Sequence, residues 1–258
     1  MNTTGQELVK MVNISKMFGP IRALSHVDFD VNRKEIIALV GDNGAGKSTL
    51  VRILSGIWQP SEGEMYFEGT RVPHFSPDKA EELGIQAVHQ GFGLVNTMDI
   101  QRNVFLGSEP YKGGFLRLLD FDKMKAASRE VLQTIGVKTR ITPESEVATL
   151  SGGEKQAIKI GRAVYYKAKL IIMDEPTIAL SVRERHRVLE ITQEIKEKGI
   201  SVIFISHNIH IIYDICDRVV IMEGGEKVGD FRKDEISLED VIGLIREGKL
   251  YYKQQGQQ

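Results

Sequence analysis

The chain has 258 residues, enough for one large α/β domain or for a domain that carries a smaller lobe. Its formal net charge is -1, so no broad basic field favours nucleic acid or an anionic membrane surface as a partner. The single cysteine, Cys216, excludes an internal disulfide, and no apolar run approaches the ~20 residues that cross a bilayer. We therefore expect no nucleic-acid partner, and any membrane role to come through another protein.

Three stretches in the first part of the chain alternate apolar and polar residues, as half-buried antiparallel strands do. They are residues 8–15, 24–31 and 64–68. The run from Ile36 to Val40 is different because every residue in it is apolar, which is typical of a strand buried in a parallel sheet. The sequence therefore predicts two kinds of sheet.

The buried strand leads into a glycine-rich turn and then into an amphipathic helix that begins near Lys47. The turn fits the phosphate-loop pattern GxxxxGK[ST] in the strand–loop–helix context that this pattern requires. Glycines let backbone N–H groups surround an oxyanion, and the helix N-terminus adds its positive dipole end. Lys47 would reach the β and γ phosphates of a nucleoside triphosphate, and the Ser48 hydroxyl would ligate Mg²⁺. The predicted nucleotide-binding residues are Gly41, Asn43, Gly44, Gly46, Lys47, Ser48 and Thr49.

The middle of the chain changes character. Residues 78–83 indicate a short helix and residues 85–89 a strand, whereas the pattern from about 99 to 166 is helical with few strand-like runs. Pro110 and Pro143 interrupt it. We expect a helical lobe inserted into the domain.

Strand patterns return in the last third. Residues 169–173 and 200–205 are apolar strands separated by a polar-faced helix at 183–198, and such a unit makes its two strands parallel. Residues 218–222 and 226–231 then indicate a hairpin.

The strand at 169–173 is followed by two adjacent carboxylates, Asp174 and Glu175. Because ligands bind at the carboxyl edge of an open α/β sheet, acids placed there indicate a site. Asp174 would hold Mg²⁺, directly or through water, and Glu175 would orient and polarise an attacking water molecule. A solvated pair of acids at a strand end is the alternative interpretation.

The stretch LSGGEKQ, residues 150–156, has the Ser151-x-x-Glu154 spacing of a capping box, so a helix should begin at Gly152. Capping alone does not explain two consecutive glycines, each of which costs about 1 kcal/mol relative to alanine in a helix. Their use would be to bare backbone N–H groups to a phosphate. We interpret Ser151, Gly152 and Gly153 as phosphate ligands, with a plain helix start as the alternative.

With these motifs in this order, the chain resembles the ATP-binding cassette (ABC) ATPases over nearly its whole length. The resemblance gives roles to three further residues. Gln90 matches the glutamine that contacts Mg²⁺ and water at the hinge of the helical lobe, and His207 matches the histidine that contacts the γ-phosphate. Phe18 stands where the family stacks an aromatic ring on adenine. Without the resemblance, each of the three has an ordinary structural explanation.

The implied fold class is α/β, a P-loop ATPase core with a mostly parallel sheet, an antiparallel β subdomain and an inserted helical lobe. We expect residues 1–95 and 166–235 to form the nucleotide-binding core. Residues 96–165 would form the helical lobe, and residues 236–258 a C-terminal helix and polar tail.

The resemblance also implies ATP and Mg²⁺ as cofactors and a mechanism that needs two chains. Two copies meet head to tail, and each ATP lies between Lys47 of one chain and Ser151, Gly152 and Gly153 of the other. Glu175, His207 and Gln90 would be the catalytic residues, and Ser48, Gln90 and Asp174 the metal ligands.

A subclass is indicated by the segment PTIALSVRE after Glu175, which resembles the ATPases of bacterial simple-sugar importers. The family usually has Asp at position 181, where this chain has Ser181, and Ser181-x-x-Glu184 is itself a capping box. Two features depart from this subclass. Gly91 follows Gln90 where an acid is common, and many members are tandems whereas this chain has one cassette.

These resemblances imply the ATPase subunit of a monosaccharide importer, peripheral on the cytoplasmic face of the inner membrane. Its partners would be a second copy of the chain, membrane-spanning permease subunits and, indirectly, a solute-binding protein. The helical lobe would dock, with residues 91–98 carrying the ATP state to it. Three alternatives stay open: an ABC ATPase for a nucleoside, amino acid or lipid, a soluble non-transport ABC protein, and a P-loop kinase.

Overall fold

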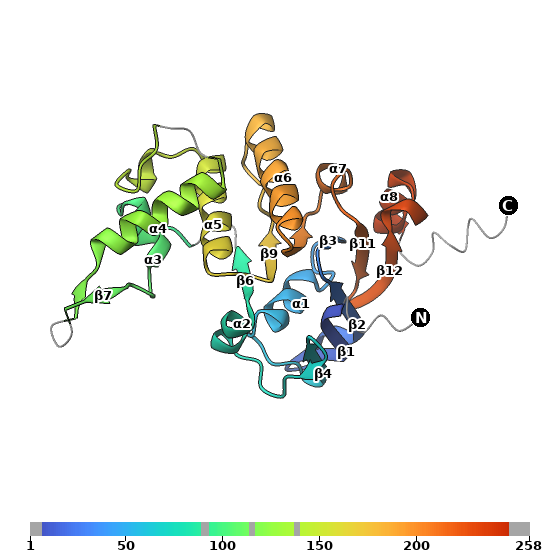
Figure 1. The fold of residues 1–258 in the computed structure, drawn as a ribbon. Coiled ribbons are helices and arrows are strands. Elements are labelled where there is room, and N and C mark those ends of the chain that lie inside the picture. The colour runs from blue at the N-terminus through green and yellow to red at the C-terminus, as the bar shows by residue number, and fades with distance from the viewer. Residues whose placement is uncertain (1–6, 89–92, 114–116, 137–139, 248–258) are drawn as a thin grey trace, which may run out of the picture.

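The computed structural model describes residues 7–88, 93–113, 117–136 and 140–247. It confirms the predicted α/β fold, with a 4-stranded antiparallel sheet and a 6-stranded, mostly parallel sheet (Figure 1). Among the described residues, no helix is both long and apolar enough to cross a membrane.

The first sheet is antiparallel and has the order β2-β1-β4-β5. Its strands are β1 (Glu7–Phe18), β2 (Ile21–Asn32), β4 (Glu62–Phe67) and β5 (Thr70–Arg71). The alternating stretches of the sequence do form strands. Their alternation arises because one face of each strand is largely buried and the other is more exposed. Strands β1 and β2 are longer than predicted, since their pairing continues to the turn between Phe18 and Ile21.

The second sheet has the order β12-β11-β3-β10-β9-β6. Its strands are β3 (Ile36–Val40), β6 (Ile85–Val88), β9 (Leu170–Asp174), β10 (Ser201–Ile205), β11 (Arg218–Glu223) and β12 (Glu226–Arg232). All neighbours are parallel except β11 and β12, which form the predicted hairpin. Parallel strands place their carboxyl ends at one edge, and this edge positions the site.

Successive residues of the parallel strands point into two different cores. Ile36, Ala38 and Val40 belong to a core shared with helices α3 to α8, whereas Ile37 and Leu39 face helix α1 and the antiparallel sheet. The helices are α1 (Lys47–Leu54), α2 (Pro77–Leu83), α3 (Ile100–Phe105), α4 (Phe121–Thr134), α5 (Gly152–Tyr165), α6 (Val182–Glu197), α7 (Ile209–Ile212) and α8 (Leu238–Glu247). Both faces of the sheet are therefore covered, which explains why its strands are uniformly apolar.

The stretch predicted as helical contains α3, α4, a short 3-10 turn η2 (Val147–Thr149) and α5. It also contains a small hairpin of β7 (Tyr111–Lys112) and β8 (Leu118–Leu119), which the sequence pattern did not reveal. Two-residue strands are too short to show an alternating pattern. In Figure 1 these elements lie beyond the β6 end of the parallel sheet.

Candidate nucleotide-binding site

The turn between β3 and α1 is shaped by glycines that no other residue could replace without a shift. A Cβ on Gly41 would lie 2.1 Å from the Met222 carbonyl oxygen, and one on Gly46 would lie 2.8 Å from Leu24 Cδ2. Gly46 also has a φ of 99°, a left-handed conformation, at the residue that precedes the first turn of α1. The loop thus closes tightly against its surroundings and delivers Lys47 to the start of the helix.

Lys47 is almost fully buried, with 6% of its surface exposed. Its Nζ donates to the carbonyl oxygens of Gly41 at 2.7 Å and Asp42 at 2.9 Å, so the ammonium group lies over the loop. Burial lowers the pKa of Lys47, and the carboxylates of Glu175, Asp42 and Asp174 act in the opposite direction. A cation held in such a place is suited to bind a phosphate.

A cavity of about 410 Å³ opens in front of this loop. It gathers residues that are far apart in the sequence, from the β1–β2 turn, the phosphate loop, α1 and the ends of β9 and β10. Ten predicted site residues line it: Phe18, Asn43, Gly44, Gly46, Lys47, Ser48, Thr49, Asp174, Glu175 and His207. Gly41, also a predicted site residue, does not line the cavity, but its carbonyl oxygen accepts a hydrogen bond from Lys47.

The acidic end of β9 faces this cavity because β9 and β10 are in parallel register, with Asp174 beside Ile205. The Glu175 N–H donates to the Ile205 carbonyl at 3.1 Å, and its Oε1 lies 2.8 Å from His207 Nδ1. Glu175 has a φ of 51°, which is uncommon for a residue with a side chain and is the kind of local strain found at functional sites.

Burial raises the pKa of Glu175, although His207 and Lys47 oppose the rise. The side chain of Glu175 is 11% exposed and that of His207 is 51% exposed. A carboxylate of raised basicity beside an imidazole can accept a proton from a water molecule in the cavity. The pair can therefore perform base-assisted hydrolysis.

Phe18 ends β1 and is not a core residue, because 38% of its surface is exposed. The ring packs edge to face against Trp58 with centroids 4.7 Å apart, and Lys16 Nζ lies 5.1 Å from its centroid. Ile21, Arg22 and Ala23 continue the wall of the cavity beyond the turn. The sequence pattern missed these three residues because the alternation becomes clear only at Leu24.

The structure does not bring Ser151, Gly152 and Gly153 into this cavity. Ser151 caps α5 through the predicted capping box with Glu154. Ser151 and Gly152 are exposed, whereas Gly153 is buried against α6. Gln90, predicted as a catalytic and metal-binding residue, lies outside the described residues.

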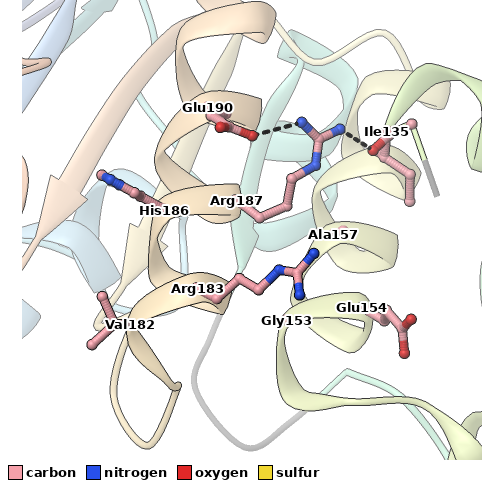
Figure 2. Close-up of a pocket in the computed structure, with 10 residues that line it drawn as sticks. Ile135, Gly153, Glu154, Ala157, Val182, Arg183, His186, Arg187 and Glu190 are labelled. Atoms are coloured by element: carbon pink, nitrogen blue, oxygen red, sulfur yellow. Dashed lines mark hydrogen bonds and ion pairs between the residues drawn. The ribbon is translucent and has the colours of Figure 1, made fainter. Parts of the chain in front are cut away.

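A larger cavity, of about 730 Å³, lies between α5 and α6 and holds no phosphate-loop residue (Figure 2). Arg187 crosses it, donating to the Ile135 carbonyl at 2.7 Å and to Glu190 at 3.0 Å. Arg187 and Glu190 are thus engaged with each other, and Arg187 also binds the end of α4. The nucleotide-binding chemistry is concentrated in the smaller cavity.

A parallel sheet with a phosphate loop after one strand and an acidic end on another defines a P-loop nucleotide-binding protein. The family model described as ABC transporter matches residues 24–178, more than half of the chain, and the chain belongs to this family. As a member of this family, the chain is an ATPase, and ATP is the nucleotide that it binds.

Relatives in three organisms match most of the chain. The xylose/arabinose import ATP-binding protein of Sulfolobus acidocaldarius is 39% identical, over 93% of this chain and 94% of its own length. The fructose import ATP-binding protein of Rhizobium meliloti is 36% identical, over 91% and 92%. The ribose import ATP-binding protein of Clostridium tetani is 40% identical over 96% of this chain, which spans only 49% of that relative.

Solved structures agree with the fold. A nucleotide-free ATP-binding cassette from an ABC transporter has a TM-score of 0.80 at 25% identity, covering 95% of this chain and 98% of its own. A structure of the ADP conformation of an ATP-binding cassette of an ABC transporter has a TM-score of 0.81 at 25% identity with the same coverage.

Proposed function

We propose that this chain is the ATP-hydrolysing subunit of an ABC importer for a simple sugar. The observation that carries the proposal is the family match together with three relatives named as import ATP-binding proteins for xylose/arabinose, fructose and ribose. The match covers nearly the whole length of two of them. The segment PTIALSVRE gave the same indication from the sequence.

In this proposal the β and γ phosphates lie against the phosphate loop, where Lys47 supplies the positive charge. Ser48 and Asp174 would hold Mg²⁺, which neutralises phosphate charge when bound. The donors fit this ion, since a hydroxyl and a carboxylate oxygen line the cavity together. No group of three acidic, histidine or cysteine side chains that could hold a metal occurs in the described part of the chain.

Glu175 would take a proton from the attacking water, and His207 would hold Glu175 in place and contact the γ-phosphate. Their 2.8 Å contact and the raised pKa of Glu175 support these roles. The exposed face of Phe18 would stack on adenine. Gln90 keeps its predicted role as a metal and water contact.

The composite site needs a second chain. Ser151 and Gly152 are exposed and do not line the phosphate-loop cavity of their own chain, which supports contact with the nucleotide of another copy. Two copies placed head to tail would bury two ATP molecules, each between one phosphate loop and the partner's α5. Hydrolysis would then release the two chains.

The remaining partners are permease subunits that would hold the chain at the cytoplasmic face of the inner membrane, with a solute-binding protein acting through them. We assign docking to the helical lobe, residues 96–165. A groove of about 280 Å³ lies where this lobe meets the core, between β6 and α5, with Arg162 in its wall.

The direct test is to recover the tagged chain from gently solubilised native membranes and to identify what accompanies it. The proposal predicts polytopic subunits, and an associated binding protein that carries a sugar. Recovery of the chain only from the soluble fraction, or with soluble partners alone, would contradict it.

A further inference from the structure

Glu184 lies where the N-termini of two helices meet. Its Oε1 accepts the N–H of Gly153 in the first turn of α5 at 3.0 Å. Its Oε2 accepts the N–H of Ser181, at the start of its own helix α6, at 3.0 Å and the Ser181 hydroxyl at 2.8 Å. Because both helix starts carry partial positive charge, one carboxylate between them stabilises their close approach.

The two glycines of LSGGEKQ are explained by this contact. A Cβ on Gly153 would lie 2.9 Å from Cβ and Cγ of Glu184, and one on Gly152 would lie 2.7 Å from Leu180 Cδ2. Any side chain at position 153 would therefore push α6 away. The Gly153 N–H is turned toward Glu184, inside the same chain, and not toward the surface.

The Glu184 carboxylate is charged at neutral pH. Hydrogen bonds from the backbone N–H groups of Gly153 and Ser181 lower the pKa of Glu184 from 4.5 to about 2, and the Ser151 hydroxyl adds to this effect. The Glu184 carboxylate thus already occupies two hydrogen-bond donors at the start of α5, on Gly153 and Ser151. The composite site assigns the same two donors to a phosphate. Two anions compete for the same donors.

We propose that Glu184 is a further residue of the composite ATP site. Its carboxylate sets the ATP concentration that is needed to join two chains. In the free chain it holds the Gly153 N–H, and it yields this donor when a phosphate bound to the partner reaches α5. The second oxygen stays on Ser181, so α6 remains capped during the exchange. This inference rests on the proposed function, because it needs a phosphate at the start of α5.

The test uses the full chain with Glu175→Gln, in which hydrolysis is expected to stop, and adds Glu184→Gln. Glutamine also serves in a capping box, so the fold should be kept while the negative charge is removed. The ATP concentration that gives half-maximal dimer, measured by sedimentation with Mg²⁺, should fall roughly two- to tenfold. Glu190→Gln is the matched control, since it removes one charge from the same helix at a residue that pairs with Arg187 instead.

A mainly structural Glu184 would give an unchanged or higher ATP requirement, and either result would overturn the inference while leaving the proposed function intact. An equal fall with Glu190→Gln would also overturn it, because only general charge would then matter. A Glu175→Gln parent that never dimerises would overturn the composite site itself, and this inference with it. Should Glu184→Gln fail to fold, Glu184→Asp withdraws the carboxylate from Gly153, and the same fall is expected.

Discussion

The ammonium group of Lys47 is held over the phosphate loop by two carbonyl oxygens, and replacing it removes the principal buried cation of the cavity. A charged hydrogen bond contributes about 1.5–3 kcal/mol. We predict that Lys47→Ala raises the dissociation constant for ATP roughly 10- to 100-fold in calorimetric titration. Lys123→Ala, on the exposed surface of α4, is the control. Unchanged affinity would remove Lys47 from the phosphate site.

Phe18 offers a half-exposed ring at the edge of the cavity. Stacking of a base on an aromatic ring contributes about 1–3 kcal/mol, so Phe18→Ala should raise the dissociation constant for ATP roughly 5- to 100-fold. Hydrolysis at saturating ATP should keep its rate, because the ring takes no part in the proton transfer that we assign to Glu175. Phe121→Ala, 42% exposed on α4, controls for loss of a surface aromatic. Loss of folding with normal affinity in the folded fraction would indicate a packing role instead.

Single residues were predictable where a motif fixes their spacing. A few consecutive residues were enough to predict the phosphate loop and the acidic strand end, and the structure places both around one cavity. Glu184 was predicted only as a cap for α6, because its bond to Gly153 joins residues 31 positions apart. Such a contact depends on how α5 packs against α6, which no local pattern encodes.

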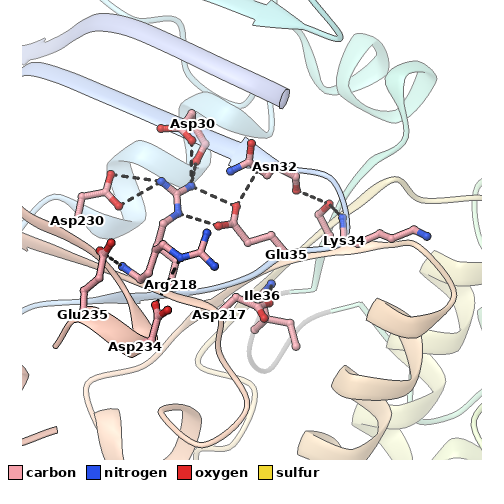
Figure 3. Close-up of polar contacts among 12 residues, drawn as sticks. Asp30, Asn32, Lys34, Glu35, Ile36, Asp217, Arg218, Asp230, Asp234 and Glu235 are labelled. Carbon is pink, nitrogen blue, oxygen red and sulfur yellow. Dashed lines mark hydrogen bonds and ion pairs between the residues drawn. The ribbon is translucent and has the colours of Figure 1, made fainter. Parts of the chain in front are cut away.

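At the scale of elements, one arginine joins the ends of several strands (Figure 3). Arg218, at the start of β11, pairs with Glu35 at 2.9 Å before β3, Asp30 at 3.1 Å in β2 and Asp230 at 3.1 Å in β12. Arg218 is 9% exposed. Burial alone would lower its pKa, but the three carboxylates raise it and keep the guanidinium charged. The cluster thus ties the antiparallel sheet to the parallel one.

We predict that Arg218→Ala lowers the free energy of unfolding by roughly 2–3 kcal/mol, because the largely buried carboxylate of Glu35 loses its charged partner, whereas Asp230 keeps Lys227. Chemical denaturation measures the loss. Arg183→Ala, at an exposed position on α6, should change it by no more than about 0.5 kcal/mol. A loss below about 1 kcal/mol for Arg218→Ala would show that the two sheets are held together by their apolar contacts alone.

Periodicity predicted where the helices and strands lie in the sequence more reliably than it predicted which strands pair with each other. The uniformly apolar strands and the alternating strands are distinguished because one sheet is covered on both faces and the other on one. The β7–β8 hairpin was not predicted, because each of its strands has only two residues and such short strands show no alternating pattern. The order of strands in the parallel sheet is a property of packing, and the sequence pattern predicted only its parallel character.

At the scale of the whole molecule, the phosphate loop and the start of α5 face different surroundings. The cavity takes its walls from both sheets, whereas Ser151 and Gly152 lie exposed outside it. One chain therefore holds the phosphate-loop half of the site and, outside that cavity, an exposed helix start, and Gly152 shares a neighbouring cavity of about 290 Å³ with Glu175. The head-to-tail arrangement came from family resemblance, because no pattern within one chain shows where a second chain binds.

The most direct test of this account is the mass of the Glu175→Gln variant in ATP and Mg²⁺, measured by light scattering. Glutamine keeps the shape of Glu175 but cannot accept the proton, so turnover should fall roughly 100-fold or more while ATP stays bound. We predict a stable particle of twice the 28.9 kDa chain mass, which reverts to single chains when Lys47→Ala is added. A variant that binds ATP and yet stays monomeric at saturating nucleotide would contradict the composite site.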